Sequence, residues 1–263
     1  MTTGKSATWP LWSAVATVSF ASGIGFATYI LRLRDRERLR QATSRTMKSL
    51  RKSQRAAAPL LTPFTSKAKV VVIGAGSYGT ALSYVAALNG HQVILFMRDQ
   101  KQCDCINVNG YNPKYLSNYK LDPNGNGVKG ICTVLDLKTE LETPGVIAIL
   151  ALPCQKLPDW IREHRDLIPP TALLCSTAKG LYLPTKQLVG HAILDALERA
   201  EQPLAFLSGP SFAEEILKKF PTAVVVASDQ LFHAVRIQKL LSNSRSFRVY
   251  TSQDTVGKLQ CIE

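Results

Sequence analysis

Apolar residues along the chain gather into short runs rich in valine, isoleucine and leucine, separated by segments whose apolar positions follow a helical period. The short runs are typical of strands buried on both faces. We expect strands at 69–74, 92–97, 145–152, 171–176, 203–207, 222–227 and 246–250, helices at 80–88, 155–164, 185–199, 211–219 and 230–241, and a loop at 112–130. Strands that alternate with helices predict an α/β fold with a parallel sheet covered on both faces, to which the last runs add strands of mixed direction.

A glycine-rich turn, GAGSYG at 74–79, joins the first expected strand to the first expected helix. Gly74 permits the tight turn, Gly76 allows a phosphate to approach the backbone, and Gly79 lets the helix pack against the strand. The helix N-terminus then offers N–H groups and a positive dipole end to a pyrophosphate. An ordinary turn with three glycines is the alternative, but the strand, turn, helix and strand together favour a doubly wound, Rossmann-type, mostly parallel sheet that binds NAD. The predicted cofactor contacts here are Gly74, Gly76, Ser77, Tyr78 and Gly79.

The end of the second expected strand departs from the simplest NAD-binding pattern. An acidic residue at this point would bind the ribose 2′-hydroxyl and repel a 2′-phosphate. The sequence instead has Met97 and Arg98, followed by Asp99. Arg98 can stack on adenine or pair with a 2′-phosphate, or it can be a solvated surface residue. NAD is therefore the expected cofactor, and NADP is not excluded.

The first part of the chain contains a long uncharged run. No charged side chain occurs between residues 6 and 31, a length sufficient to cross a bilayer as a helix. Trp9 and Trp12 near one end and Tyr29 near the other suit the headgroup region, and an arginine-rich segment follows at 32–40. We therefore expect a single hydrophobic, transmembrane helix that anchors the chain, with the following domain facing the cytosol or an equivalent compartment.

An organelle-targeting leader is the main alternative to this anchor, because residues 32–58 are rich in Arg, Ser and Ala and poor in acid. A secretory signal would carry its positive charges before the apolar run, where only Lys5 occurs. The expected organisation is a hydrophobic span or leader (1–31), a basic linker (32–68), a dinucleotide-binding domain (69–257) and a divergent tail (258–263).

The formal net charge of +13 invites a nucleic-acid interpretation, but its distribution argues against one. Residues 1–68 carry 12 Lys and Arg against two acidic residues, whereas residues 69–263 carry 20 against 17. The basicity therefore belongs to the leader and linker, and we expect no nucleic-acid partner. The six cysteines form no C-x-x-C pair and no zinc-type spacing with histidine, so we expect a reducing compartment and no metal.

Several longer motifs follow the glycine turn in a fixed order. They are NPKYL at 112–116, ALPCQ at 151–155, STAKGL at 176–181, LSGPSFAEEI at 207–216, PTAVVVAS at 221–228 and FRVYTSQDTVG at 247–257. Together these segments resemble the soluble NAD(P)-dependent glycerol-3-phosphate dehydrogenases over essentially all of residues 69–257. Ser117 replaces a proline that is usual in the family, and Cys154 replaces a small hydroxyl residue.

The resemblance implies hydride transfer that interconverts dihydroxyacetone phosphate and sn-glycerol 3-phosphate. It implies that Lys179 is the substrate-site lysine of this half of the enzyme and that it polarises the carbonyl, the kind of charge stabilisation that ketone reduction requires. Pro153 and Ala213 match positions that line the cofactor, and Phe96 matches an aromatic near the adenosine, although each suits plain packing too. Glu215 either orients the site or complements a helix dipole.

After residue 257 the resemblance implies a continuation into an all-helical domain that carries further substrate groups, and we expect this chain to lack that domain. Without it a Rossmann module cannot exclude water or hold the substrate phosphate, so we expect weak NAD(H) binding and little turnover. The main hypothesis is a truncated dehydrogenase sequence. The alternatives are a membrane-anchored, non-catalytic NAD-binding module and a related reductase acting on another ketone or a nucleotide sugar. The uncovered face is expected to be apolar and allows homo-oligomer formation.

Overall fold

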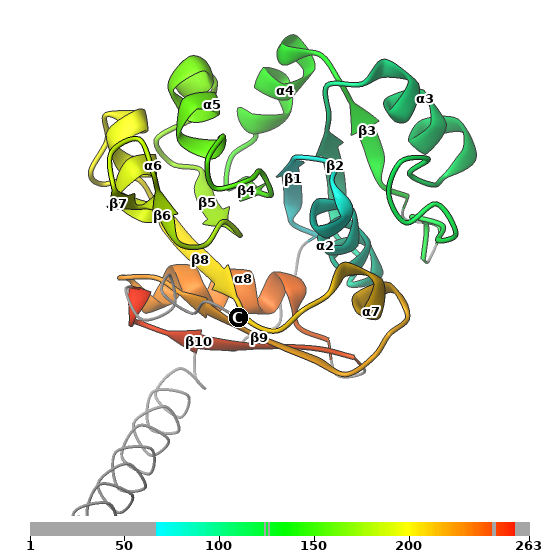
Figure 1. The fold of residues 1–263 in the computed structure, drawn as a ribbon. Helices are drawn as coiled ribbons and strands as arrows, with labels where there is room; N and C mark the ends of the chain where they lie inside the picture. Colours follow the sequence, from blue (N-terminus) through cyan, green and yellow to red (C-terminus); the bar gives the residue numbers. More distant parts are fainter. Residues whose placement is uncertain (1–66, 124, 126, 244–245, 256–263) are drawn as a thin grey trace, which may run out of the picture. The chain divides into compact units, whose positions relative to one another are not determined.

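The computed structural model describes residues 67–255 except 124, 126, 244 and 245. Its centre is an eight-stranded sheet with helices on both faces (Figure 1). The strands are β1 (Lys69–Ile73), β2 (Gln92–Phe96), β3 (Lys129–Ile131), β4 (Ile147–Leu150), β5 (Leu173–Ser176), β8 (Leu204–Ser208), β9 (Thr222–Ala227) and β10 (Phe247–Ser252). A separate antiparallel hairpin is formed by β6 (Leu181–Tyr182) and β7 (Gln187–Leu188).

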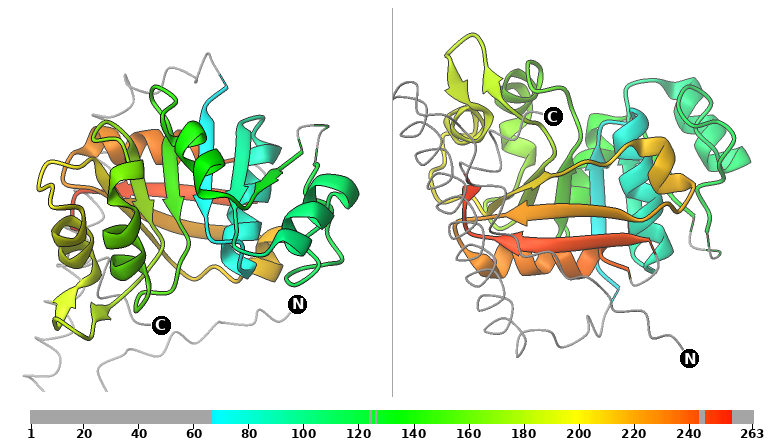
Figure 2. Two further views of the ribbon diagram at one scale, coloured as in Figure 1. Left: turned by 90° about the horizontal axis from the view of Figure 1, so that it is seen from above. Right: turned by 60° about the horizontal axis from the view of Figure 1, so that its bottom comes forward.

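The strand order is β10-β9-β8-β5-β4-β1-β2-β3. From β3 to β8 all neighbours are parallel, whereas β8 and β9 are antiparallel and β9 and β10 are parallel again. Figure 2 shows β9 and β10 (orange to red) side by side at one edge of the sheet. The Rossmann-type, mostly parallel sheet and the mixed direction of its last strands were both expected from the sequence, and both are confirmed.

The helices form two layers because each central strand is apolar on both faces. In β1, Val70 and Val72 belong to one buried cluster, and Val71 and Ile73 belong to another. The first cluster receives α2 (Ser77–Leu88), α3 (Gln100–Asn109), α7 (Ala213–Leu217) and α8 (Leu231–Leu241). The second receives α4 (Val134–Leu141), α5 (Leu157–His164) and α6 (Val189–Leu197), and a short 3-10 turn, η2 (Arg165–Leu167), follows α5.

Three elements between residues 100 and 141 were missed in the sequence. Helix α3 buries only Gln102, Cys103 and Ile106, so it has no apolar stripe to recognise. Strand β3 is three residues long, and α4 buries Leu137 and Leu141 alone. The expected helix at 185–199 is also shorter, because β7 occupies its start.

No helix in the described part of the chain is long and apolar enough to cross a membrane. The expected span at 6–31 and the basic segment after it lie outside the described residues, as does the tail at 258–263. These expectations therefore remain predictions.

Candidate dinucleotide-binding site

The carboxyl ends of the central strands open into a cavity of about 960 Å³. The chain passes from β1 to β2 and β3 on one side, and then returns to β4 on the other side of β1. Ligands bind to doubly wound sheets at such a reversal of strand order. The cavity lining includes Gly74, Gly76, Ser77, Tyr78, Gly79, Phe96, Arg98, Pro153 and Lys179. The structure thus brings together residues that are 105 positions apart in the sequence, from Gly74 to Lys179.

The glycine turn has the tight geometry that its sequence predicts. Gly74 adopts φ +110°, and a Cβ added there would lie 2.5 Å from the Ala151 carbonyl oxygen. A Cβ on Gly79 would lie 1.9 Å from the Gly74 carbonyl oxygen, so only glycine lets α2 start this close to β1. At Gly76 an added Cβ would meet no described atom within 4 Å, because this residue borders the open cavity. The turn therefore leaves space beside its backbone for a phosphate, and its residues fit a dinucleotide.

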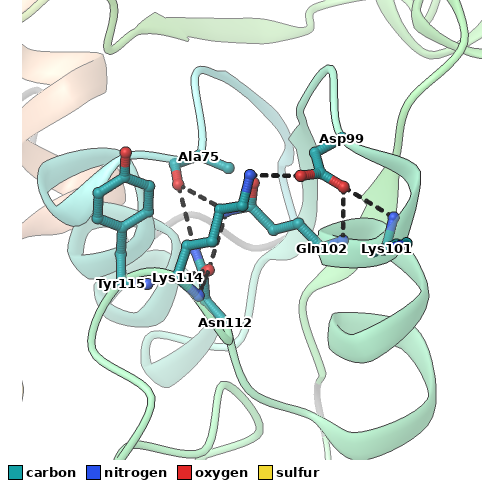
Figure 3. A network of polar contacts seen from close by, with 7 residues as sticks. All are labelled: Ala75, Asp99, Lys101, Gln102, Asn112, Lys114 and Tyr115. Carbon is teal, nitrogen blue, oxygen red and sulfur yellow. Dashed lines mark hydrogen bonds and ion pairs between the residues drawn. The ribbon is translucent and has the colours of Figure 1, made fainter.

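A buried amide network holds the turn from behind (Figure 3). The Ala75 carbonyl oxygen accepts hydrogen bonds from the side-chain amides of Gln102 (3.0 Å) and Asn112 (3.1 Å). The Gln102 amide also donates to Asn112 Oδ1 (2.9 Å), and the Asn112 amide donates to Thr80 Oγ1 (2.8 Å). The network joins the turn to α3 and to the loop that follows α3. Asn112 was expected only as part of a family motif, and Gln102 was not singled out.

The end of β2 forms the part of the cavity expected to receive adenosine. Phe96 is buried, and the centroid of its ring lies 6.3 Å from that of Trp160. Arg98, two residues further on, is exposed. The Asp99 carboxylate accepts from the N–H groups of Lys101 (2.9 Å) and Gln102 (3.2 Å), and so caps α3.

Asp99 also forms an ion pair with Lys114 (Figure 3). This hydrogen bond from Lys114 and the helix N–H groups lower the pKa of Asp99. Its carboxylate is therefore engaged with the protein, whereas Arg98 extends toward solvent. This arrangement favours neither a hydrogen bond from an acidic side chain to the ribose 2′-hydroxyl nor exclusion of a 2′-phosphate.

The opposite end of the cavity is formed by the segments after β5 and β8. Lys179 Nζ donates to the Gly209 carbonyl oxygen (3.4 Å), which also accepts from Ser211 Oγ (3.3 Å). The Tyr78 hydroxyl and Ser211 Oγ lie 2.8 Å apart, so the glycine turn and the loop after β8 are hydrogen-bonded to each other. Pro153 follows β4 between them. A cation, two hydroxyl groups and the backbone of a glycine turn thus surround one space.

Ala213 is the one predicted site residue outside this lining. It begins α7 and packs against the first buried cluster, so a role in cofactor binding remains a prediction. Glu215 is exposed in the first turn of α7. Asp159 and Trp160 line the cavity without having been predicted, and the Tyr182 hydroxyl and Arg162 lower the pKa of Asp159. Within the described ranges no group of three or more His, Cys, Asp or Glu side chains is placed to hold a metal ion.

The sheet order, the glycine turn and the cavity at the strand ends define a Rossmann-type dinucleotide-binding domain. Residues 69–234 match the family model described as "NAD-dependent glycerol-3-phosphate dehydrogenase N-terminus". The chain belongs to this family.

Individual relatives agree with the family assignment. The chain is 36% identical over 189 residues to glycerol-3-phosphate dehydrogenase [NAD(P)+] from Lawsonia intracellularis, a match that covers 72% of this chain and 53% of the relative. It is 36% identical over 191 residues to chloroplastic glycerol-3-phosphate dehydrogenase [NAD(+)] 2 from Arabidopsis thaliana, a match that covers 72% of this chain and 44% of that relative. The crystal structure of glycerol-3-phosphate dehydrogenase from Coxiella burnetii matches with a TM-score of 0.63 and 31% identity, covering 73% of this chain and 55% of that one. The chain therefore spans about half the length of these relatives.

Proposed function

We propose that this chain supplies the dinucleotide-binding half of a glycerol-3-phosphate dehydrogenase and binds NAD(H), with NADP(H) accepted as well. The observation that carries the proposal is that Lys179 and the glycine turn at 74–79 border the same cavity. The substrate pair is proposed to be dihydroxyacetone phosphate and sn-glycerol 3-phosphate, and the names of the relatives give glycerol 3-phosphate.

Lys179 is proposed to act on the substrate oxygen. A bound reduced nicotinamide supplies a hydride, and ketone reduction also requires that negative charge on the oxygen be stabilised and then neutralised by a proton. Lys179 lines this end of the cavity, and its ammonium group donates a hydrogen bond to the Gly209 carbonyl oxygen (3.4 Å). That contact holds its side chain toward the cavity, where it can polarise a carbonyl group.

The dinucleotide is proposed to lie across the carboxyl edge of the sheet. The N–H groups at the start of α2 would receive the pyrophosphate, because a helix N-terminus with small residues binds anions. Phe96 and Arg98 would contact the adenosine, and Pro153 would lie nearer the nicotinamide. Arg98 and the engagement of Asp99 with Lys114 support acceptance of a 2′-phosphate.

Titration of the full chain with NADH, followed by protein-to-nicotinamide energy transfer, tests the proposal. We expect saturable binding, and we expect Lys179→Met to retain it but to lose the effect of added dihydroxyacetone phosphate on the complex. Lys138→Met is the matched control, because Lys138 is an exposed lysine on α4, away from the cavity lining. Absence of NADH binding to the unaltered chain would refute the proposal.

Turnover distinguishes the two functional candidates. A dehydrogenase half should oxidise NADH with dihydroxyacetone phosphate once the helical domain of a relative is supplied on the same chain. A membrane-anchored, non-catalytic NAD-binding module should bind NADH with or without that domain and never turn over.

We further propose that residues 6–31 anchor the chain in a membrane, with the dinucleotide-binding domain on the cytosolic or an equivalent side. The uncharged run and the arginines after it support this proposal. Resistance to alkaline extraction from membranes, with an intact N-terminus, is the expected result. Release of a processed chain would favour an organelle-targeting leader instead, and sedimentation of the same sample tests whether a homo-oligomer forms.

A further inference from the structure

We propose that Gln102 and Asn112 are positioning residues for the dinucleotide: they orient the Ala75–Gly76 peptide so that its N–H group faces the bound pyrophosphate. The inference rests on the proposed function, because it assumes that a dinucleotide binds at the glycine turn. Neither residue belongs to the glycine turn, and neither is expected to touch the pyrophosphate itself.

The orientation follows from one carbonyl group. The Ala75 carbonyl oxygen accepts from Gln102 Nε2 (3.0 Å) and from Asn112 Nδ2 (3.1 Å), and both side chains are buried. In a trans peptide the C=O and N–H groups point in opposite directions, and no described peptide is cis. The Gly76 N–H group therefore points away from the two amides, on the side where Gly76 borders the cavity.

The Gly76 N–H group is also available for a ligand. Among the residues that the structure describes, it donates to no acceptor, whereas the carbonyl of the same residue accepts from the Thr80 N–H group (2.9 Å). A buried network on one side and an unused donor on the other are the features of an N–H group prepared for an anion.

Asn112 cannot turn away from this arrangement. It is fully buried, and its amide nitrogen donates to both Ala75 and Thr80 Oγ1 (2.8 Å). Its Oδ1 accepts from Gln102 and from the N–H groups of Lys114 (3.1 Å) and Tyr115 (3.3 Å). Figure 3 shows that Lys114 and Tyr115 lie on the loop that this one side chain ties to the turn. Because both residues line the cavity, Asn112 sets the position of the loop relative to the phosphate site.

The experiment compares ligands that differ in their phosphate groups. The full chain is titrated with NADH, ADP and adenosine, and the thermal midpoint of each variant is measured alongside. Gln102→Met and Asn112→Ala should weaken ADP and NADH by about tenfold, the loss expected when one hydrogen bond to a charged group is misdirected. Adenosine, which has no phosphate, should bind within about twofold of the unaltered chain.

Two matched variants report on general effects of losing a hydrogen-bonded side-chain amide, Gln202 in a buried place and Asn107 in an exposed one. Gln202→Met removes a buried glutamine whose amide donates to the Ala172 carbonyl (2.7 Å), and Asn107→Ala removes an asparagine that bonds both polar groups of Gly130 (3.0 and 2.8 Å). Neither Gln202 nor Asn107 lines the cavity. Both should lower the thermal midpoint and leave the affinity for ADP unchanged.

Selective ¹⁵N-glycine labelling gives a direct readout. Addition of ADP should shift the Gly76 amide proton downfield in the unaltered chain, and the shift should be much smaller in Gln102→Met, which serves if Asn112→Ala does not fold. Equal losses for ADP and adenosine, an equal loss in Gln202→Met, or an undiminished Gly76 shift would overturn the inference while the proposed function stands. If the unaltered chain binds neither ADP nor NADH, the proposed function itself fails.

Discussion

Two glycines of the same turn should respond to alanine in opposite ways. Gly76→Ala places a methyl group in open space, at φ −73°, a backbone conformation that alanine adopts readily. Gly79→Ala places the same group 1.9 Å from the Gly74 carbonyl oxygen. We expect the first substitution to weaken ligand binding and keep the fold, and the second to weaken the fold.

The magnitudes follow from these contacts. At Gly79 the helix must move by roughly 1 Å or more, and overpacking of this kind costs about 1–3 kcal/mol, only part of which is offset by the better helix propensity of alanine. A loss of ~2 kcal/mol lowers the thermal midpoint of a domain of this size by about 4–8 °C. At Gly76 alanine is a poorer N-cap than glycine but reduces the entropy of the unfolded chain, and the two effects nearly cancel, within about 1 kcal/mol.

NADH binding should be weakened more by Gly76→Ala than by Gly79→Ala, the reverse of the order expected for stability. A methyl group at Gly76 keeps the pyrophosphate from the backbone N–H groups, and loss of one such charge-assisted bond is worth about 1.5–3 kcal/mol, or roughly a tenfold to hundredfold weaker dissociation constant for NADH. The assay is differential scanning calorimetry paired with NADH titration of the same samples. Tight NADH binding by Gly76→Ala, or an unchanged thermal midpoint in Gly79→Ala, would refute the assignment of the turn.

Three further predictions concern the rest of the domain. His91 is buried and accepts a hydrogen bond from the Ala68 N–H group (3.3 Å), and burial lowers its pKa below 6.5. The unfolded state therefore binds more protons than the folded state between pH 7 and 5, so the free energy of unfolding should fall as the pH drops through this range. The fall should be smaller in His91→Gln. Thr133 caps α4 by accepting from the Asp136 N–H group (3.0 Å), so Thr133→Ala should cost about 1 kcal/mol in a denaturant titration. Burial raises the pKa of Cys175 to about 12, and its thiol should react with iodoacetamide only after the protein unfolds, as mass spectrometry of labelled peptides would reveal.

The parts of the fold that the sequence predicted are those whose apolar residues form a strand-like run or follow a helical period. The run Thr222–Ala227 was expected as a strand with the bounds that β9 has, because it is a short run rich in valine, which is typical of a buried strand. Helix α3 was missed because its largely polar sequence shows no helical period of apolar residues. The signals that mark it are its caps: Asp99 accepts from two helix N–H groups at the start, and Gly110 adopts φ +73° at the end.

The candidate site divides in the same way. The glycine turn was predicted because its chemistry is local, a backbone without Cβ atoms, whereas Lys179 was predicted from the resemblance of its segment to the family. The hydrogen bond between Tyr78 and Ser211 joins residues 133 positions apart, and no local pattern indicates that pairing. Gln102 is similar, because only the packing of α3 shows that its amide reaches the carbonyl of Ala75.

This division has a physical reason. A phosphate-binding turn needs particular residues at adjacent positions, since each one sets a backbone angle or a close approach, and these requirements are visible in the sequence. The orientation of its N–H groups needs only a donor that reaches the carbonyl from behind, and a side-chain amide from any neighbouring element supplies one. The Gln102 and Asn112 amides meet that need from a helix and a loop. Residues that position a binding group can therefore stand at more places in the sequence than the residues that form the group, although affinity depends on both sets of residues.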